Sequence, residues 1–148
     1  MDDATLMALA IEEAGRAAVH HDVPVGALVV RGGEVIASRH NERELTGDPT
    51  AHAEILALRD AAATRGSWRL DDATLVVTLE PCTMCAGAAV NARIERVVFG
   101  ARDLKAGAVV SLAGVGSDPR LNHEFAVRVD VAADECGELL TRFFAERR

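Results

Sequence analysis

The amino-acid sequence predicts an α/β fold, a three-layer α/β/α sandwich with helices on both faces of a five-stranded mixed sheet. Two observations predict this class. Short apolar runs of strand length are interleaved along the chain with longer segments whose apolar residues recur at helical spacing. Two of these runs also flank a glycine pair that suits a tight hairpin, so we expect a mixed sheet.

The first predicted element is an amphipathic helix from Ala4 to about Val19, with apolar residues at helical spacing and two glutamates on the opposite side. Two antiparallel strands follow within residues 25–39. They flank Gly32 and Gly33, and glycine reaches a positive φ in a tight turn without steric cost.

A second helix is predicted over residues 48–63, after a polar stretch. Asp48 suits its N-cap and Pro49 its first position, because proline has no N–H group to leave unpaired there. The continuous apolar segment 73–79 has the length of a buried strand. Residues 81–94 are predicted to form another helix that proline initiates.

Residues 95–101 are predicted to form a fourth strand, and a glycine-containing loop follows at residues 102–107. The alternating segment 125–131 is the predicted fifth strand. The chain ends in a predicted helix over residues 132–148, where leucine, phenylalanine and cysteine residues form an apolar stripe.

Length and composition predict one domain over residues 1–148, since 49% hydrophobic residues suffice for a single core. The acidic N-terminus and the lack of an apolar run near ~18 residues predict a cytoplasmic protein without a membrane partner. A net charge of -7 argues against a broad electrostatic footprint on nucleic acid, so any polyanion would bind a local patch. Lys105 is the only lysine among 16 basic residues, which makes it a functional candidate.

The stretch EPCTMC contains two of the three cysteines. If Pro81 is the first helical residue, Cys82 and Cys85 lie one turn apart on one face, and the helix N-terminus stabilises their thiolates. A thioredoxin-like redox motif is the alternative for this spacing, but it predicts a position near the chain start without other ligands. A metal site is therefore the favoured interpretation.

His52 is the best additional ligand candidate, and Glu54 follows two residues later. Zinc with three protein ligands keeps an open position for water, whereas a closed structural site needs a fourth ligand that the spacing does not supply. Residues i and i+2 of a regular helix point about 200° apart, so His52 and Glu54 can flank one site only if the helix start faces the metal. A helix cap and a solvated first-turn acid are the alternatives for this pair.

Structural roles are the first expectation for the remaining histidines and Cys136. His20 and His21 end the first helix, where a cation meets the helix dipole favourably. His40 and His123 lie in polar sequence and are weaker candidates for substrate contact. Cys136 falls on the apolar stripe of the last helix and is expected to be a small buried hydrophobe.

The order H-A-E followed by P-C-x-x-C is the signature of zinc-dependent nucleoside deaminases. The chain resembles their tRNA-specific adenosine deaminase family in VPVGALVV, HN, DPTAHAEILALR, LEPCTMCAGA, RVVFGARDLKAG, LNH and ADECGELLTRFFAERR. This resemblance runs nearly end to end. It implies a cytidine deaminase-like fold, a homodimer, and hydrolytic deamination of adenosine to inosine at the wobble position of an arginine tRNA.

The resemblance also implies roles for individual residues of the metal site. His52, Cys82 and Cys85 match the ligands of one Zn²⁺ per subunit. Glu54 matches the proton shuttle, which takes a proton from water and delivers protons to the ring nitrogen and the departing amine.

Four further residues match positions that contact the substrate in this family. Asn41 matches an asparagine that hydrogen-bonds the target nucleotide. Asp103 and Lys105 match a loop that contacts the tRNA anticodon stem-loop, and Phe144 lies in the C-terminal helix that abuts bound RNA.

Two other functions remain open from the sequence. A deaminase of a free nucleobase or nucleoside, such as cytosine, cytidine or guanine, would use the same chemistry and would fit the acidic charge better. A non-catalytic zinc-stabilised scaffold would need a fourth protein ligand.

Overall fold

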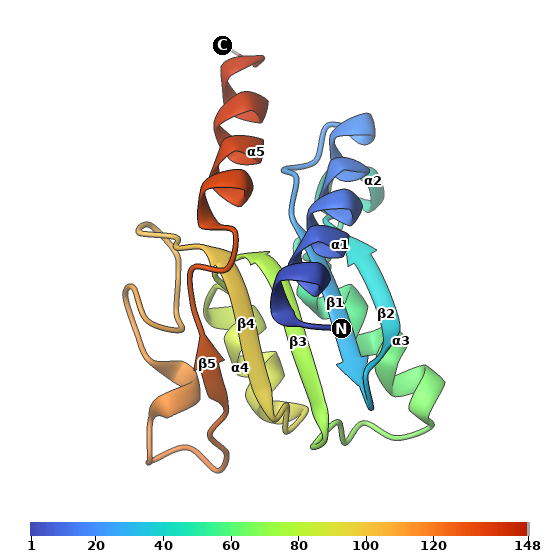
Figure 1. Ribbon diagram of the computed structural model, residues 1–148, viewed down its shortest axis with the longest axis vertical. Helices are drawn as coiled ribbons and strands as arrows, with labels where there is room; N and C mark the ends of the chain where they lie inside the picture. Colours follow the sequence, from blue (N-terminus) through green and yellow to red (C-terminus); the bar gives the residue numbers. More distant parts are fainter. Residues whose placement is uncertain (148) are drawn as a thin grey trace.

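The computed structural model describes residues 1–147, which form a five-stranded sheet in the order β2-β1-β3-β4-β5 (Figure 1). The strands are β1 (Gly26–Arg31), β2 (Glu34–His40), β3 (Ala73–Leu79), β4 (Arg96–Ala101) and β5 (Ala126–Arg128). β1 is antiparallel to both β2 and β3, whereas β3, β4 and β5 run parallel to one another. The predicted mixed sheet is confirmed.

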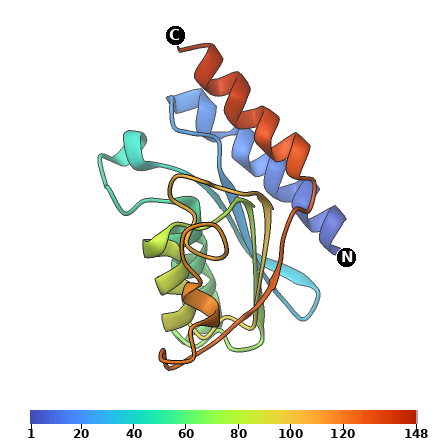
Figure 2. The ribbon, with the colours of Figure 1, turned by 90° about the vertical axis from the view of Figure 1, so that its left-hand side faces the viewer.

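Helices cover both faces of this sheet (Figure 2). The two that cover one face are α1 (Asp3–Gly15) and α5 (Ala133–Ala145), and the two on the other are α3 (Ala53–Arg65) and α4 (Thr83–Asn91). Short helical turns complete the chain, namely η1 (Ala17–His20), α2 (Arg43–Thr46) and η2 (Val115–Ser117). The three-layer α/β/α sandwich is therefore confirmed.

Each face of the sheet has its own apolar core. The core under α1 and α5 includes Leu6, Met7, Leu28, Val76 and Val98, and the larger core under α3 and α4 is built mainly from valine, leucine and alanine. Helix α1 packs unusually close to β1, because a Cβ atom at Gly26 would collide with the backbone oxygen of Ala10.

Both site helices begin later than the sequence predicts. Residues 48–52 precede α3, and the Asp48 carboxylate accepts hydrogen bonds from the backbone N–H and hydroxyl of Thr50 instead of capping the helix. An Asx-type turn thus replaces the first predicted turn of helix. Pro81 also lies outside α4, which begins at Thr83 with Cys82 as its N-cap residue.

Other boundaries differ for similarly local reasons. The first helix ends at Gly15 and continues as the 3₁₀ turn η1, and β5 pairs with β4 over only three residues. The polar stretch before the second predicted helix contains α2, which Gly47 ends in a left-handed conformation. Within residues 1–147, no helix has the length and apolar character needed to cross a membrane.

Candidate deaminase site

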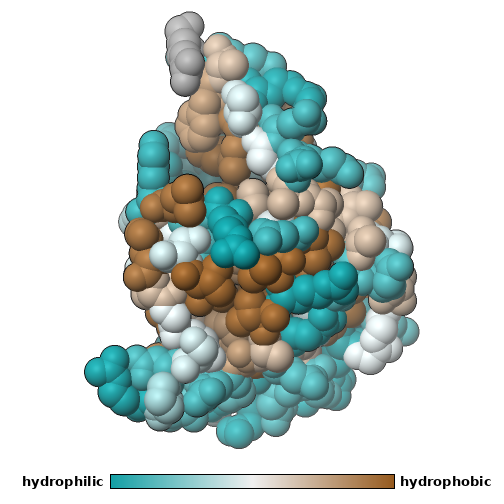
Figure 3. Space-filling model, turned by 60° about the vertical axis from the view of Figure 1, so that its left-hand side comes forward, coloured by the Kyte–Doolittle hydropathy of each residue, from teal (hydrophilic) through white to brown (hydrophobic). Residues whose placement is uncertain are grey.

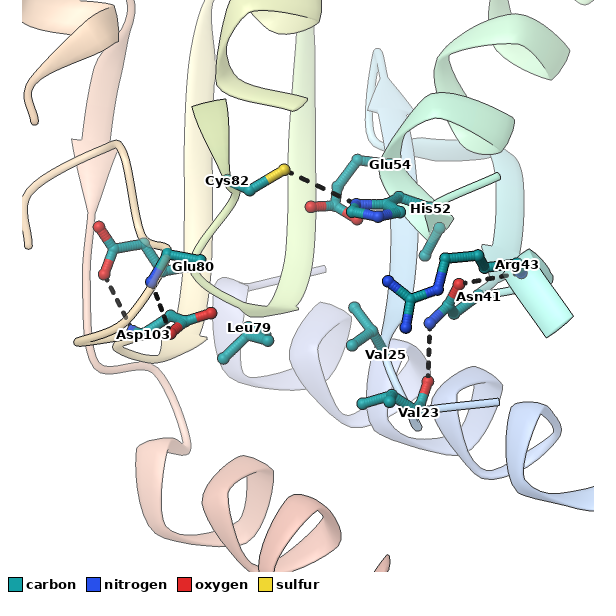
Figure 4. Close-up of a pocket in the computed structure, with 12 residues that line it drawn as sticks. Val23, Val25, Asn41, Arg43, His52, Glu54, Leu79, Glu80, Cys82 and Asp103 are labelled. Atoms are coloured by element: carbon teal, nitrogen blue, oxygen red, sulfur yellow. Dashed lines mark hydrogen bonds between the residues drawn. The ribbon is translucent and has the colours of Figure 1, made fainter. Parts of the chain in front are cut away.

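The predicted metal ligands converge where α3 and α4 begin (Figure 4). His52 is the N-cap residue of α3 and has an extended backbone, with φ -72° and ψ 150°. Cys82 is the corresponding N-cap residue of α4, and Cys85 lies in the first turn of that helix. Because β2 and β3 run in the same direction, the helices that follow them start at the same end of the sheet.

The extended backbone of His52 removes the objection that residues i and i+2 of a helix point apart. His52 lies before the helix, whereas Glu54 is its second residue, so the helical angle between them does not apply. Figure 4 shows both side chains at the same cavity, with Cys82 opposite.

The three ligand atoms have the spacing of a metal site. Nδ1 of His52 lies 3.7 Å from Sγ of Cys82 and 3.5 Å from Sγ of Cys85. Tetrahedral zinc, bonded at ~2.3 Å to sulfur and ~2.0 Å to nitrogen, sets an N···S separation of roughly 3.6 Å. All three ligand atoms lie within 4.8 Å of one another, so the donor set fits a metal ion. Residues 1–147 place no fourth histidine, cysteine or carboxylate in this group.

Proton sharing between the two thiols favours one thiolate even without a metal. A hydrogen bond from Cys85, assisted by His52, lowers the pKa of Cys82 to about 3. The same contact and burial raise the pKa of the Cys85 thiol. The hydrogen bond to Cys82 also raises the pKa of His52, against the effect of its burial. A divalent cation would displace the remaining thiol proton and hold both sulfurs as thiolates.

Glu54 is the buried carboxyl group beside these ligands, with only 5% of the residue exposed. Burial is the main cause that raises its pKa. A carboxyl group that holds a proton more readily than usual, next to a metal site, suits a role in which it both accepts and donates protons.

These side chains open into a cavity of about 180 Å³. Its walls include Val23, Val25, Asn41, Arg43 and Leu79. Asn41 is buried and braces the wall, because its Nδ2 donates to the carbonyl of Val23 and its Oδ1 accepts the backbone N–H of Arg43. The predicted substrate contact Asn41 therefore lies at the same cavity as His52 and Glu54.

Comparison with known proteins identifies the family. A family model described as MafB19-like deaminase matches residues 1–148. The chain is 47% identical to the tRNA-specific adenosine deaminase of Bacillus subtilis strain 168, over 99% of this chain and 91% of that protein. It is 45% identical to the enzyme of the same name from Haemophilus influenzae, over 99% of this chain and 85% of that protein.

The chain belongs to the tRNA-specific adenosine deaminase family. A solved structure from a study of A-to-I editing by tRNA:A34 deaminases at the wobble position of transfer RNA superposes with a TM-score of 0.87 at 46% identity, covering 90% of this chain and 97% of that one. Guanine deaminase from Bacillus subtilis superposes with a TM-score of 0.67 at 30% identity, over 76% of this chain and 82% of that one. The cytidine deaminase-like fold is thereby confirmed.

A second cavity of the deaminase, of about 450 Å³, lies beside the first and shares Val23, Leu79, Asp103 and Ala106 with it. Its walls bring together the three predicted RNA-contacting residues, Asp103, Lys105 and Phe144. Phe144 is about half exposed on α5, and Leu104 is 76% exposed. Figure 3 shows this side of the molecule, where apolar surface gathers below the projecting α5 and is crossed by hydrophilic groups.

Glu80 is a site residue that the sequence reasoning missed. Its buried carboxylate accepts hydrogen bonds from the backbone N–H groups of Asp103, Val109, Val110 and Ser111 and from the Ser111 hydroxyl. Burial opposes its ionisation, but these hydrogen bonds prevail and lower its pKa. Glu80 thus fixes the loop that carries Asp103 and Lys105. A glutamate two residues before a predicted metal-ligating cysteine was the available signal.

The weaker candidates face away from the pocket. His40 contacts Glu13 of α1 through Nδ1 at 2.6 Å, and Nε2 of His123 lies 2.7 Å from the carbonyl oxygen of Ile94. Cys136 is buried on α5, as predicted, and packs so closely on β4 that no side chain fits at Gly100. His20 and His21 lie at and after the end of η1 rather than on α1.

Proposed function

We propose that this protein hydrolyses the 6-amino group of the wobble adenosine of tRNA, which gives inosine and ammonia. The observation that carries the proposal is the group His52, Cys82 and Cys85 beside the buried carboxyl of Glu54, at a cavity adjoining Lys105 and Phe144. Relatives at 40–47% identity are named tRNA-specific adenosine deaminases, which supports this substrate.

The cofactor we propose is one Zn²⁺ per subunit, held by His52 Nδ1 and the two thiolates. When bound, zinc supplies the Lewis acidity that makes a water molecule nucleophilic near neutral pH. Three protein ligands leave room for that water, and the 3.5 and 3.7 Å nitrogen–sulfur distances support zinc geometry.

Glu54 moves the protons of the reaction. Its carboxylate accepts a proton from the water that attacks C6, and the resulting carboxyl group donates a proton to ring nitrogen N1. It then transfers the second water proton to the departing amine, so that water is consumed and ammonia is released. Burial, which raises the pKa of Glu54, supports this two-way role.

The other proposed residues hold the substrate. Asn41 orients the target nucleotide with the second N–H of its amide, which its bond to Val23 leaves free. The target base must leave its stack to enter the cavity, and that is least costly in a single-stranded loop. Lys105 and Asp103 contact the anticodon stem-loop, and Phe144 packs on it. An arginine tRNA is the proposed substrate.

A homodimer is part of the proposal. An apolar hollow of about 380 Å³ between α3 and α4 is lined by Leu58, Trp68, Ala88 and Ala92, and Trp68 is 60% exposed. A second copy of the chain is the proposed occupant of this face. Analytical ultracentrifugation should show a dimer that the variant Trp68→Arg weakens, and a monomeric wild type would refute this assembly.

One experiment tests the reaction and its main competitor together. Purified protein is incubated with total tRNA, with an arginine anticodon stem-loop, and with free adenosine, cytidine, cytosine and guanine. We expect inosine at the wobble position and no turnover of the free compounds. Turnover of guanine alone would favour the alternative that the protein deaminates a free nucleobase. Guanine is included because the chain is 30% identical to a guanine deaminase. Bound zinc without turnover of any of these compounds would favour the non-catalytic zinc-stabilised scaffold.

A further inference from the structure

Two histidines meet behind the pocket wall, outside the metal site. Nε2 of His20, at the end of η1, lies 3.1 Å from Nε2 of His40, at the end of β2. Each ring binds a buried carboxylate through its other nitrogen, His20 Nδ1 with Asp22 at 2.7 Å and His40 Nδ1 with Glu13 at 2.6 Å. The order Asp22–His20–His40–Glu13 therefore forms one continuous chain of polar contacts.

The hydrogen-bond pattern fixes where the protons of this chain lie. The carboxylates also accept other donors: Asp22 accepts the backbone N–H groups of Glu44 and Leu45, and Glu13 accepts the Ser38 hydroxyl. They act as ionised acceptors, so both Nδ1 atoms carry hydrogen. Two neutral rings would then point bare Nε2 lone pairs at each other across 3.1 Å, which is repulsive. One additional proton between the Nε2 atoms turns this contact into an N–H···N hydrogen bond.

Ring geometry supports a proton over a metal ion at this place. The ring centroids lie 5.2 Å apart, close to the nitrogen gap plus the two ring radii, so the Nε2 atoms face each other nearly in line. Two imidazoles on one metal ion would instead meet at an angle. Among residues 1–147, no third ligand completes a metal-binding group with this pair.

The local charges also favour a cation here. Asp22 is 1% exposed, and His20 is its one ion-pair partner in the described part of the chain. Glu13 pairs with Arg16, and Glu42, whose carboxylate lies 3.9 Å from Nε2 of His40, pairs with Arg39. A buried carboxylate without a counter-charge is costly, and a shared imidazolium proton supplies that charge.

The chain of contacts is joined to the substrate pocket. Asp22, which binds His20, also holds the backbone of Glu44 and Leu45 in α2. His40 directly precedes Asn41, and Asn41 together with Arg43 lines the cavity. The two histidines thus anchor both ends of the short segment that carries these pocket residues.

We infer that His20 and His40 share one proton in a charged imidazolium–imidazole bridge, and that this bridge is a positioning device for Asn41 and Arg43 at the substrate pocket. The bridge exists while a single proton lies between the two Nε2 atoms. Without that proton the two Nε2 lone pairs face each other at 3.1 Å, so the rings separate and the segment loosens. Substrate binding then weakens, while the metal ligands stay in place.

The bridge itself is tested in the wild-type holoenzyme by ¹⁵N-edited NMR of the histidine side chains. We expect one Nε2-bound proton shared by two ring nitrogens, a signal that is absent in His20→Asn and kept in His21→Asn. Two unprotonated Nε2 atoms in the wild type would overturn the inference. More than one metal equivalent per chain, reduced to one by His20→Asn, would overturn it as well.

The positioning role rests on the proposed function and is tested by steady-state kinetics on the anticodon stem-loop. His20→Asn should raise KM about threefold to tenfold with kcat and zinc content unchanged. His21→Asn is the matched control, since His21 is exposed and its φ of 67° suits asparagine. Equal KM values for wild type and His20→Asn would refute the positioning role. An inactive wild type would refute the proposed function instead, and the NMR result would stand apart from it.

Discussion

Nδ1 of His52 lies 3.5 Å from Sγ of Cys85, although 33 residues separate them in the chain. A tetrahedral metal ion sets nearly this separation between a bound nitrogen and a bound sulfur. The contact joins the starts of α3 and α4, so the helix pair and the metal site depend on each other.

Loss of one ligand should abolish metal binding. Cys85→Ala leaves two ligands, so we expect its zinc content, measured by elemental analysis after dialysis, to fall from one per chain to below a tenth. Cys136→Ala is the matched control, because that buried cysteine lies on α5 away from the site. Equal zinc in both variants would refute the ligand assignment. Chelation should likewise inactivate the wild type, and added zinc should restore it.

Removal of the proton shuttle should stop the reaction but not the folding. Glu54→Gln keeps the shape of the side chain and loses its basicity, so we expect turnover of the stem-loop to fall by about 10²–10⁴ with zinc retained. Glu44→Gln, an exposed substitution on α2, should behave as wild type. An active Glu54→Gln enzyme would remove Glu54 from the mechanism.

Lys105 should contribute to RNA binding and not to the metal site. Lys105→Ala removes one positive charge from the second cavity, so we expect weaker stem-loop binding. The slope of the logarithm of the affinity against the logarithm of the salt concentration should become smaller by about one. Arg120→Ala provides the control, because Arg120 is highly exposed and does not line either cavity. Unchanged affinity and an unchanged salt slope, measured by fluorescence anisotropy, would show that Lys105 does not contact the RNA.

Glu80 should hold the loop over the pocket. In Glu80→Gln an amide N–H group faces backbone donors, so we expect amide hydrogen exchange at residues 109–111 to rise at least about tenfold. Zinc content should stay at one per chain. Glu95→Gln, at an exposed residue before β4 and at the opposite end of the sheet, should leave the exchange unchanged. Native-like protection in Glu80→Gln would mean that the loop is held by other contacts.

Asp3 should stabilise the folded protein at neutral pH, and acid should remove this stabilisation. A hydrogen bond from Arg96, with a second from Arg128, lowers the pKa of Asp3 from 3.8 to about 2. Because the pKa of Asp3 is lower in the folded state, its ionised carboxylate stabilises the fold above pH 3.8. This stabilisation is lost as the pH falls toward 2. We expect Asp3→Asn to cost about 1–2 kcal/mol of unfolding free energy at pH 7 and much less at pH 2, by urea denaturation. Glu12→Gln, exposed on the same helix, should cost nothing at either pH.

The sequence by itself determined the elements and the chemistry. Apolar periodicity predicted the helices and strands, because burial acts on residues that share a face. The order of histidine, glutamate and two cysteines predicted a three-ligand metal site, because residue type fixes which atoms can bind a metal. Helix starts were predicted less well at Pro49 and Pro81, since proline tolerates a turn before a helix as readily as its first position.

Tertiary structure alone decided which distant groups meet. The parallel direction of β2 and β3 brings His52 and Cys82 to one end of the sheet, and no local pattern encodes that pairing. It likewise decided that Glu80 holds a loop more than twenty residues away and that His20 faces His40. The physical reason is the sequence distance over which each signal acts. Apolar periodicity and helix capping act between residues a few positions apart, whereas these contacts depend on strand pairing and on the packing of helices across the sheet.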